Sequence, residues 1–221
     1  MTVSRSTIER NLDRVYRRIS AAAERTGRNP QAVRLIAVTK AVGLEEAQVL
    51  HTLGVNDLGE NRVDDAREKV EALSEARWHM IGSCQRRKAR DIVALFQYVD
   101  SVDRVELAEA LQRRCDERDK TLHVLMEVNV SGETVKHGFT PSEVVTALDR
   151  MRAFDRLNVD GLMTMAPLVD DPEETRPVFA GLRRLAQDLG LTELSMGMTN
   201  DFEVAVEEGA TQIRVGTALF A

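Results

Sequence analysis

Residues 194–220 read LSMGMTNDFEVAVEEGATQIRVGTALF, and this stretch decides how the rest of the chain is interpreted. It holds two short apolar segments that each end in a small glycine-bearing turn, Leu194-Ser195-Met196-Gly197 and Ile213-Arg214-Val215-Gly216-Thr217. One short helix is predicted between them. Glycine lets a phosphate approach the backbone, and unpaired N–H groups at strand ends point at it. The stretch therefore predicts two neighbouring strands whose ends form a phosphate-binding cradle.

Upstream of this stretch, short apolar segments alternate regularly with helical patterns. The expected strands cover residues 33–39, 55–58, 78–81, 98–102, 122–130 and 157–163. Together with the two segments near the end of the chain they make eight. Eight short strands that alternate with helices and are mostly apolar on both faces are what a closed parallel barrel requires. We therefore expect an α/β fold, a single (β/α)8 TIM barrel, with an open doubly wound sheet as the alternative.

The helices have recognisable boundary signals. An apolar stripe predicts an N-terminal helix at about 6–25, which precedes the first strand. The sequence Thr140-Pro141-Ser142-Glu143 is a capping box with proline at the first helical position, and Asp103 is expected to cap the helix that follows the fourth strand. No helix is expected after the eighth strand, so the N-terminal helix should cover the barrel there.

Composition limits the class of protein. The 221 residues are 43% hydrophobic and 30% charged, the net charge is −6, and no linker-like segment occurs, so we expect one domain over residues 1–221. An acidic balance argues against nucleic acid as a partner. No apolar run suits a signal peptide or a membrane span, which predicts a cytoplasmic protein, and we expect a monomer. The two cysteines and four histidines have no metal-binding spacing, so no metal is expected.

In a parallel barrel the residues just past each strand share one face, and that face carries the active site. These residues are Lys40, Asn61, Gly82, Ser101, Asn129, Met163, 195–197 and 214–217. Lys40 follows a largely apolar strand, and desolvation there would favour the neutral amine, which is a nucleophile towards an aldehyde. The alternative interpretation is an exposed lysine that opens the first loop.

An amine and a phosphate cradle on one barrel face fit pyridoxal 5'-phosphate (PLP), which is an aldehyde that carries a phosphate. Arg214 would then face the pyridine nitrogen. A Schiff-base phosphosugar aldolase would need the same pair, with Glu60 as the acidic residue at a strand end. Both interpretations stay open at this point.

Other polar or sulfur-containing residues are weaker candidates. His79 lies inside a strand and is expected to be a satisfied interior residue. Met165 and Met198 are expected to fill the core, and Cys84 has no nearby base that would make it a nucleophile. The basic run at 86–90 is expected to be a solvated helix face, with binding of an anionic partner as the alternative.

Several motifs along nearly the whole chain carry a family resemblance. They are Thr39-Lys40, Gly59-Glu60-Asn61, Trp78-His79-Met80-Ile81-Gly82 with Gln85 and Lys88, Ser101-Val102-Asp103-Arg104, Asn129-Val130-Ser131, Gly161-Leu162-Met163, Leu194-Ser195-Met196-Gly197-Met198 and Arg214-Val215-Gly216-Thr217. The chain closely resembles the YggS/PROSC family of pyridoxal-phosphate homeostasis proteins. It departs from the family pattern at Gly82-Ser83-Cys84-Gln85 and at Arg86-Arg87.

The resemblance implies a barrel like the N-terminal domain of alanine racemase, the type III fold of PLP proteins. It implies that Lys40 holds the cofactor as an internal aldimine. By the same resemblance Ser195, Gly216 and Thr217 would hold the phosphate. The residues that would line the cofactor are Asn61, Met196, Gly197 and Arg214.

The function expected from these observations is PLP homeostasis, in which the protein carries or buffers the cofactor for PLP-requiring apoenzymes. Robust catalysis is not expected, because racemisation needs a proton donor on each face of the substrate and Lys40 serves only one. The two tyrosines, Tyr16 and Tyr98, lie in the N-terminal helix and at a strand start. The alternatives are a PLP-dependent racemase or lyase, the aldolase, and a regulator that binds anionic partners through residues 86–90.

Overall fold

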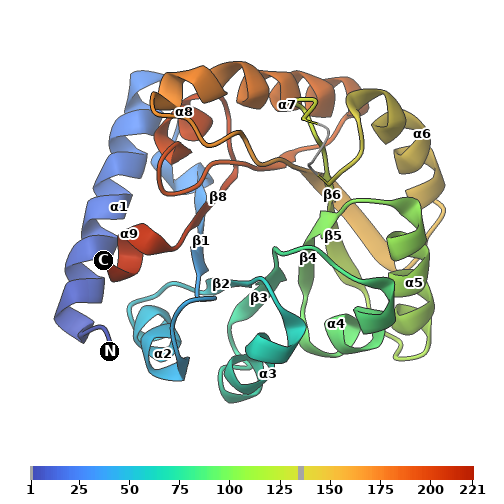
Figure 1. Ribbon diagram of the computed structural model, residues 1–221, viewed down its shortest axis with the longest axis horizontal. Coiled ribbons are helices and arrows are strands. Elements are labelled where there is room, and N and C mark those ends of the chain that lie inside the picture. The colour runs from blue at the N-terminus through green and yellow to red at the C-terminus, as the bar shows by residue number, and fades with distance from the viewer. Residues whose placement is uncertain (1, 134–136) are drawn as a thin grey trace.

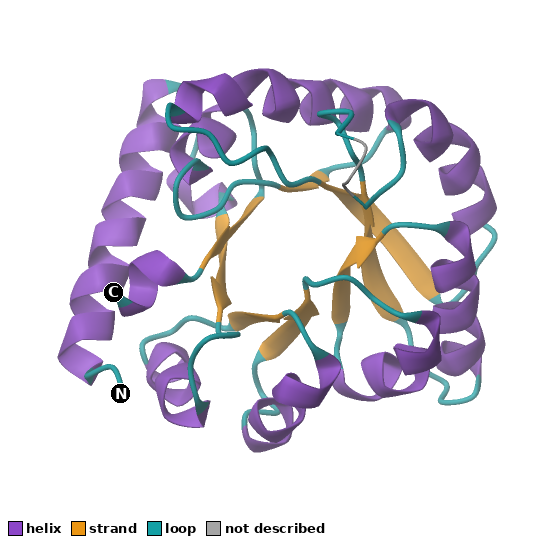
Figure 2. Cartoon of the chain, in the orientation of Figure 1, coloured by secondary structure: helices purple, strands orange, loops and turns teal. Residues whose placement is uncertain are grey.

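The computed structural model describes residues 2–133 and 137–221, and these form a closed barrel of parallel strands. The strands follow chain order around the barrel, and β1 pairs with β8 to close it (Figures 1 and 2). Their bounds are β1 (Arg34–Val38), β2 (Asp57–Glu60), β3 (Arg77–Met80), β4 (Tyr98–Val102), β5 (Leu122–Glu127), β6 (Leu157–Met163), β7 (Glu193–Ser195) and β8 (Gln212–Val215). The predicted (β/α)8 barrel is confirmed.

Helices surround the barrel on its outer side (Figure 2). The α-helices are α1 (Arg5–Arg25), α2 (Leu44–Thr52), α3 (Val63–Ala72), α4 (Ala89–Leu95), α5 (Val105–Asp116), α6 (Pro141–Met151), α7 (Arg176–Leu189), α8 (Phe202–Glu207) and α9 (Thr217–Phe220). Short 3-10 helices accompany them in the described residues: η1 (Pro30–Ala32), η2 (Arg86–Lys88) and η3 (Pro172–Thr175). Among the described residues, no helix combines the length and the apolar character needed to cross a bilayer.

The prediction that no helix follows the eighth strand was wrong. The chain makes one helical turn, α9, after β8, and α1 packs against both α8 and α9 (Figure 1). Asn11 in α1 ties the end of the chain in place, since its Nδ2 donates to the carbonyls of Leu219 at 3.2 Å and Ala221 at 2.8 Å. The N-terminal helix therefore covers this side of the barrel as expected, with its apolar stripe buried.

Other boundaries confirm some predictions and correct others. The capping box at Thr140 is present with both of its hydrogen bonds. Asp103 does not cap α5; Arg104 occupies the N-cap position, and Asp103 forms an ion pair with the Arg104 guanidinium instead. The second strand runs two residues further than predicted, to Glu60, and the fifth strand stops at Glu127 rather than at residue 130.

Buried polar side chains lie on the strands, and most of them form hydrogen bonds to neighbouring strands, loops or helices. The buried polar residues of β2 to β8 are Asp57, Glu60, His79, Asp100, Ser101, Glu127, Ser195, Gln212 and Arg214. The apolar core lies mainly between the strands and the surrounding helices. A buried polar group costs free energy unless it is hydrogen-bonded. These side chains are consequently placed by their partners as well as by the strand backbone.

His79 in β3 is fully buried between two carboxylates. Its Nδ1 lies 3.1 Å from Asp100 Oδ2 and its Nε2 lies 3.2 Å from Asp57 Oδ1. The Tyr98 ring stacks on the imidazole with 4.4 Å between ring centroids. Burial disfavours the imidazolium, but the two carboxylates outweigh it and raise the pKa of His79. The prediction that His79 is a satisfied interior residue is confirmed.

We predict that His79 makes stability depend on pH above neutrality. Because its pKa is raised in the folded chain, its contribution is fully present below the unfolded value of about 6.5 and is lost as pH rises through the folded value. Replacing His79 with Gln leaves Asp100 buried without its cationic partner, while Asp57 keeps its ion pair with Arg77, and the loss should cost about 3–5 kcal/mol at pH 6. Urea unfolding from pH 6 to 8.5 checks both expectations.

The variant should also lose the pH dependence that belongs to His79. A conservative control is His51→Gln, which changes a histidine of α2 outside this network. If the wild-type chain and the His79→Gln variant showed the same slope of unfolding free energy against pH, the assignment of the charge to His79 would be wrong.

Candidate functional site

A cavity of about 790 Å³ opens at the carboxyl ends of the strands. Its lining includes residues within two positions of the ends of β1, β2, β3 and β8, and we call it the lysine pocket. The polar or glycine residues among them are Lys40, Asn61, Gly82, Ser83, Glu127, His137, Thr199, Asn200, Asp201, Arg214, Gly216 and Thr217. Five of the predicted site residues, Lys40, Asn61, Arg214, Gly216 and Thr217, are therefore brought together.

Lys40 stands at the mouth of the lysine pocket, two residues past the end of β1. Its side chain is exposed, so the prediction that the amine is desolvated was wrong. The alternative interpretation, an exposed lysine that opens the first loop, agrees with the structure in this respect. The backbone before it is held firmly: the Thr39 hydroxyl donates to Glu60 Oε1 at 2.6 Å, and Lys69 Nζ donates to the Thr39 carbonyl at 2.7 Å. An exposed amine on a fixed backbone can meet an aldehyde that enters the pocket.

Glu60 does not line the lysine pocket. It is fully buried, and its Oε1 accepts from Lys69 Nζ at 2.7 Å as well as from Thr39. A buried ion pair of this kind is destabilising to break because the remaining charge is left uncompensated. Glu60 therefore serves to fix the ends of β1 and β2, and it is not positioned as an acid for chemistry in the pocket.

Arg214 in β8 lines the wall of the pocket although it is almost completely buried. Its Nη1 donates to Ser195 Oγ at 2.8 Å and its Nη2 donates to the Thr164 carbonyl at 3.0 Å. Burial lowers the pKa of Arg214, while the charges of Asp100 and Asp201 act in the opposite direction. An arginine keeps its charge under such conditions, so the guanidinium is a cation held in a fixed orientation.

Three of the predicted residues are absent from the pocket lining. Ser195 and Met196 are fully buried, and Met196 belongs to the apolar core. Gly197 adopts φ +92°, and an added Cβ would lie 2.5 Å from the Ala205 Cβ, so only glycine suits this turn. Its carbonyl accepts from the Arg214 N–H at 3.0 Å. Ser195 and Gly197 are therefore hydrogen-bonded to Arg214 and fix β8 without lining the pocket.

Residues that the sequence interpretation missed form the rim of the pocket. Met165 and Met198, which were expected to fill the core, are 42% and 37% exposed, and Leu168 is 87% exposed. That expectation was wrong because both methionines lie beyond the ends of β6 and β7. Glu127 was missed because β5 was extended to residue 130. A carboxylate at the end of the apolar run LHVLME is the signal that could have found it.

Glu127 places a second titratable group in the pocket. Its side chain is buried, and burial together with the charge of Asp103 raises the pKa of Glu127. Asn129, the residue predicted at this strand end, instead donates to the Glu133 carbonyl at 2.8 Å in the loop. Cys84 is buried and burial raises the pKa of its thiol to about 12, which agrees with the expectation that it is not a nucleophile.

No group of three His, Cys, Asp or Glu side chains in residues 2–133 and 137–221 could hold a metal ion. The hydrogen-bond donors of the lysine pocket include an amine, a guanidinium, side-chain amides and hydroxyls, and the glycine backbone at the end of β8. Such a set suits an organic anion with a carbonyl group.

Comparison with known proteins identifies the family. The family described as "Alanine racemase, N-terminal domain" matches residues 10–221. A protein of Aquifex aeolicus named "Pyridoxal phosphate homeostasis protein" is 39% identical, over 95% of this chain and 95% of its own. A protein of Deinococcus radiodurans with the same name is 42% identical, over 92% of this chain and 96% of its own.

A solved structure adds to these relatives. PipY of Synechococcus elongatus, in a structure described as having PLP bound, is 34% identical and superposes with a TM-score of 0.81 over 92% of this chain and 100% of its own. The resemblance found in the sequence motifs is thereby confirmed. The chain belongs to the family of pyridoxal phosphate homeostasis proteins and carries the alanine racemase N-terminal domain.

Proposed function

We propose that this protein binds pyridoxal 5'-phosphate and carries or buffers it for PLP-requiring apoenzymes. One observation carries the proposal: Lys40 and the Gly216–Thr217 turn line the same side of the lysine pocket, because they follow the paired strands β1 and β8. The names of the relatives and the PLP-bound PipY structure support it.

The residues of the pocket fit this cofactor. The bound cofactor would supply an aldehyde and an electron-accepting ring. Lys40 Nζ would bind it covalently, the backbone of Gly216 and the hydroxyl of Thr217 would donate to its phosphate, and Arg214 would face its ring nitrogen. A volume of about 790 Å³ suits a ligand of this size.

The remaining predicted contacts are part of the same proposal. Asn61 lines the pocket beside Gly82 and would pack along the ring. Ser195 as a phosphate ligand stays a prediction, and in this structure its hydroxyl accepts from Arg214. Met196 and Gly197 would act indirectly. They form the turn after β7, and the Gly197 carbonyl accepts a hydrogen bond from the Arg214 N–H, which helps to position Arg214.

We further propose that the protein works as a single domain, as a monomer, in the cytoplasm. The recipient proteins would be apoenzymes that need PLP. The apolar rim formed by Met165, Leu168 and Met198 supports contact with such a recipient, because exposed apolar side chains grouped at a site mark interaction surfaces.

We expect the loaded protein to deliver the cofactor without turning over amino acids. Arg214 at the ring nitrogen would keep that nitrogen unprotonated, which weakens the ring as an electron acceptor. Tyr98 stacks between His79 and His123 and does not line the pocket, so it is not available as a second proton donor. Assays with alanine, serine and threonine should stay below about 1 per second, while an added apoenzyme regains activity.

Turnover of any of these amino acids at roughly 1 to 1000 per second would instead favour a racemase or lyase. Glu127 would then be the first residue to test as the proton donor, since it lines the pocket and its pKa is raised. An aldolase has less support, because Glu60 is occupied by Lys69 and Thr39.

Replacing Lys40 with Ala tests the covalent bond. The variant should lose the visible absorption of the lysine-bound cofactor, and borohydride followed by mass spectrometry should find no modified lysine. Phosphate retention should survive in part because Gly216 and Thr217 are unchanged. The matched control is Lys88→Ala, since Lys88 pairs with Asp64 outside the lysine pocket and should leave the absorption unchanged.

A Lys40→Ala protein that still carried borohydride-fixed cofactor on another lysine would refute the assignment. Lys136 is the residue to inspect first, and it lies outside the described residues. Such a result would leave the fold and the family unaffected.

Replacing Thr217 with Val tests the phosphate end separately. The covalent bond at Lys40 should still form, but the loss of one hydrogen bond to a charged phosphate should weaken binding by about 1.5–3 kcal/mol, or roughly ten- to a hundredfold. Equilibrium titration with PLP measures this change. Thr192→Val, an exposed residue at the other end of the barrel, is the control, and equal affinities of the two variants would contradict the role of Thr217.

A further inference from the structure

A second cavity of about 680 Å³ lies on the outer side of the barrel, between η2 with the start of α4 and the helix α5. We call it the arginine groove. Its lining residues are Gln85, Arg86, Arg87, Ala89, Arg104, Ala110, Arg113 and Arg114. The groove and the lysine pocket have no lining residue in common, so an argument about the groove does not depend on the proposed function.

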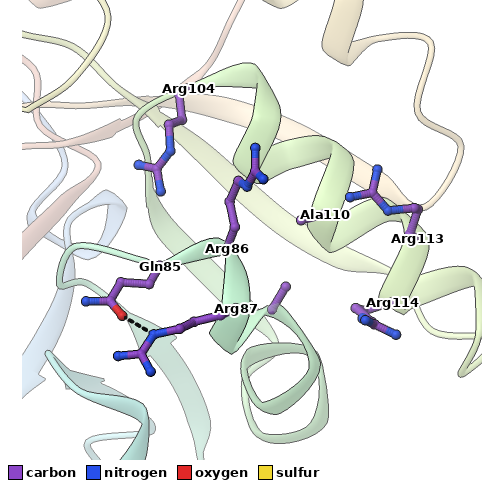
Figure 3. A pocket seen from close by; sticks show the side chains of 8 residues that line it. Gln85, Arg86, Arg87, Arg104, Ala110, Arg113 and Arg114 are labelled. Carbon is purple, nitrogen blue, oxygen red and sulfur yellow. Dashed lines mark hydrogen bonds between the residues drawn. The ribbon is translucent and has the colours of Figure 1, made fainter.

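The groove has small side chains at its base and guanidinium groups around it. Ala89 and Ala110 are buried, and they leave space between the two helical segments. Figure 3 shows Arg86 reaching from η2 towards α5 and Arg113 reaching back from α5, with Ala110 between them. A ligand in the groove would therefore meet arginines from both sides.

Three of these five arginines, Arg86, Arg87 and Arg113, form no ion pair with a carboxylate among the described residues. Arg104 pairs with Asp103, and Arg114 pairs with Glu117 at 2.6 Å. In the part of the chain that the structure describes, neither Arg86 nor Arg113 has an acidic side chain within ion-pair distance. Arg87 donates only to the neutral side chain of Gln85, at 2.7 Å (Figure 3). The groove thus holds positive charge that the protein itself does not neutralise.

Acidic residues limit the length of this positive region. On α5, Glu106 and Glu109 precede Arg113 and Arg114, and Asp116 and the C-cap residue Glu117 follow them. The helical rise puts Glu109 and Asp116 about 10 Å apart along the axis. The whole chain carries a net charge of −6. A long polyanion would extend past the groove onto acidic surface and be repelled, whereas a compact anion would meet only arginines. Arginine forks match phosphate oxygens in pairs.

We propose that the arginine groove is a second ligand site, for a compact anion that carries two or more phosphate groups. Arg86 and Arg113 would bind from opposite sides, and Arg87 would contribute a third cation. The shared chemistry is that of an oligophosphate, whether free or attached to a small organic group.

The test is calorimetric titration with inorganic tripolyphosphate. The protein is first loaded with PLP and freed of excess by gel filtration, so that the phosphate end of the lysine pocket is occupied. We expect saturable binding at one site. The double variant Arg86→Ala/Arg113→Ala should lose affinity by about tenfold or more, and Arg86→Lys/Arg113→Lys should fall between the two because charge remains but the paired geometry is lost.

The matched control is Arg10→Ala/Arg17→Ala, which removes the same charge from exposed positions on α1, across the barrel from α5 (Figure 1). It should bind tripolyphosphate as the wild-type chain does. Titration of the wild-type protein before and after loading with PLP separates the two sites: affinity should be the same in both states, and a loss on loading would locate the anion in the lysine pocket and overturn the proposal.

Other outcomes would overturn the proposal as well. These are the absence of saturable binding to the wild-type protein, equal losses in the groove variant and the α1 control, and equal affinities for orthophosphate and tripolyphosphate. Tighter binding of a single-stranded oligonucleotide or of an oligoglutamate peptide than of tripolyphosphate would assign the groove to a macromolecule instead.

Discussion

The pairing of the first strand with the last is the constraint on which the rest of this structure depends. β1 and β8 are in register from Arg34 with Gln212 to Ala37 with Val215. This pairing closes the sheet, and closure leaves no exposed edge. It also brings Lys40 and the turn at Gly216, which come from opposite ends of the chain, to one wall of one cavity. The site exists because the barrel closes.

Closure has a second consequence, which is that charged groups on the strands are removed from water. Several of them have a partner of opposite charge: Lys69 lies against Glu60, and His79 lies between Asp57 and Asp100. Such pairs give little net stability relative to apolar side chains, but removing one partner is costly. Their effect is to fix the orientation of the strand ends, and the backbone before Lys40 is held in this way.

Arg214 shows how the same principle shapes the site. Its guanidinium is buried, donates to Ser195 and to the Thr164 carbonyl, and still reaches the pocket wall. A cation held by three neighbouring strand ends cannot swing away to follow a ligand, because its orientation is already fixed. The lysine differs, since it is exposed and mobile about its own side-chain bonds. The pocket therefore combines one adaptable group with one rigid group.

The sequence by itself determined the barrel, most element boundaries and the residues at strand ends, because apolar period and capping chemistry are local. The Thr140 capping box and the strand at 98–102 are clear cases. Tertiary structure alone decided which strand-end residues meet. It buried Met196 and exposed Met198, since both follow β7 and the chain turns at Gly197 between them, and it paired Glu60 with Lys69 across elements, which no local pattern encodes.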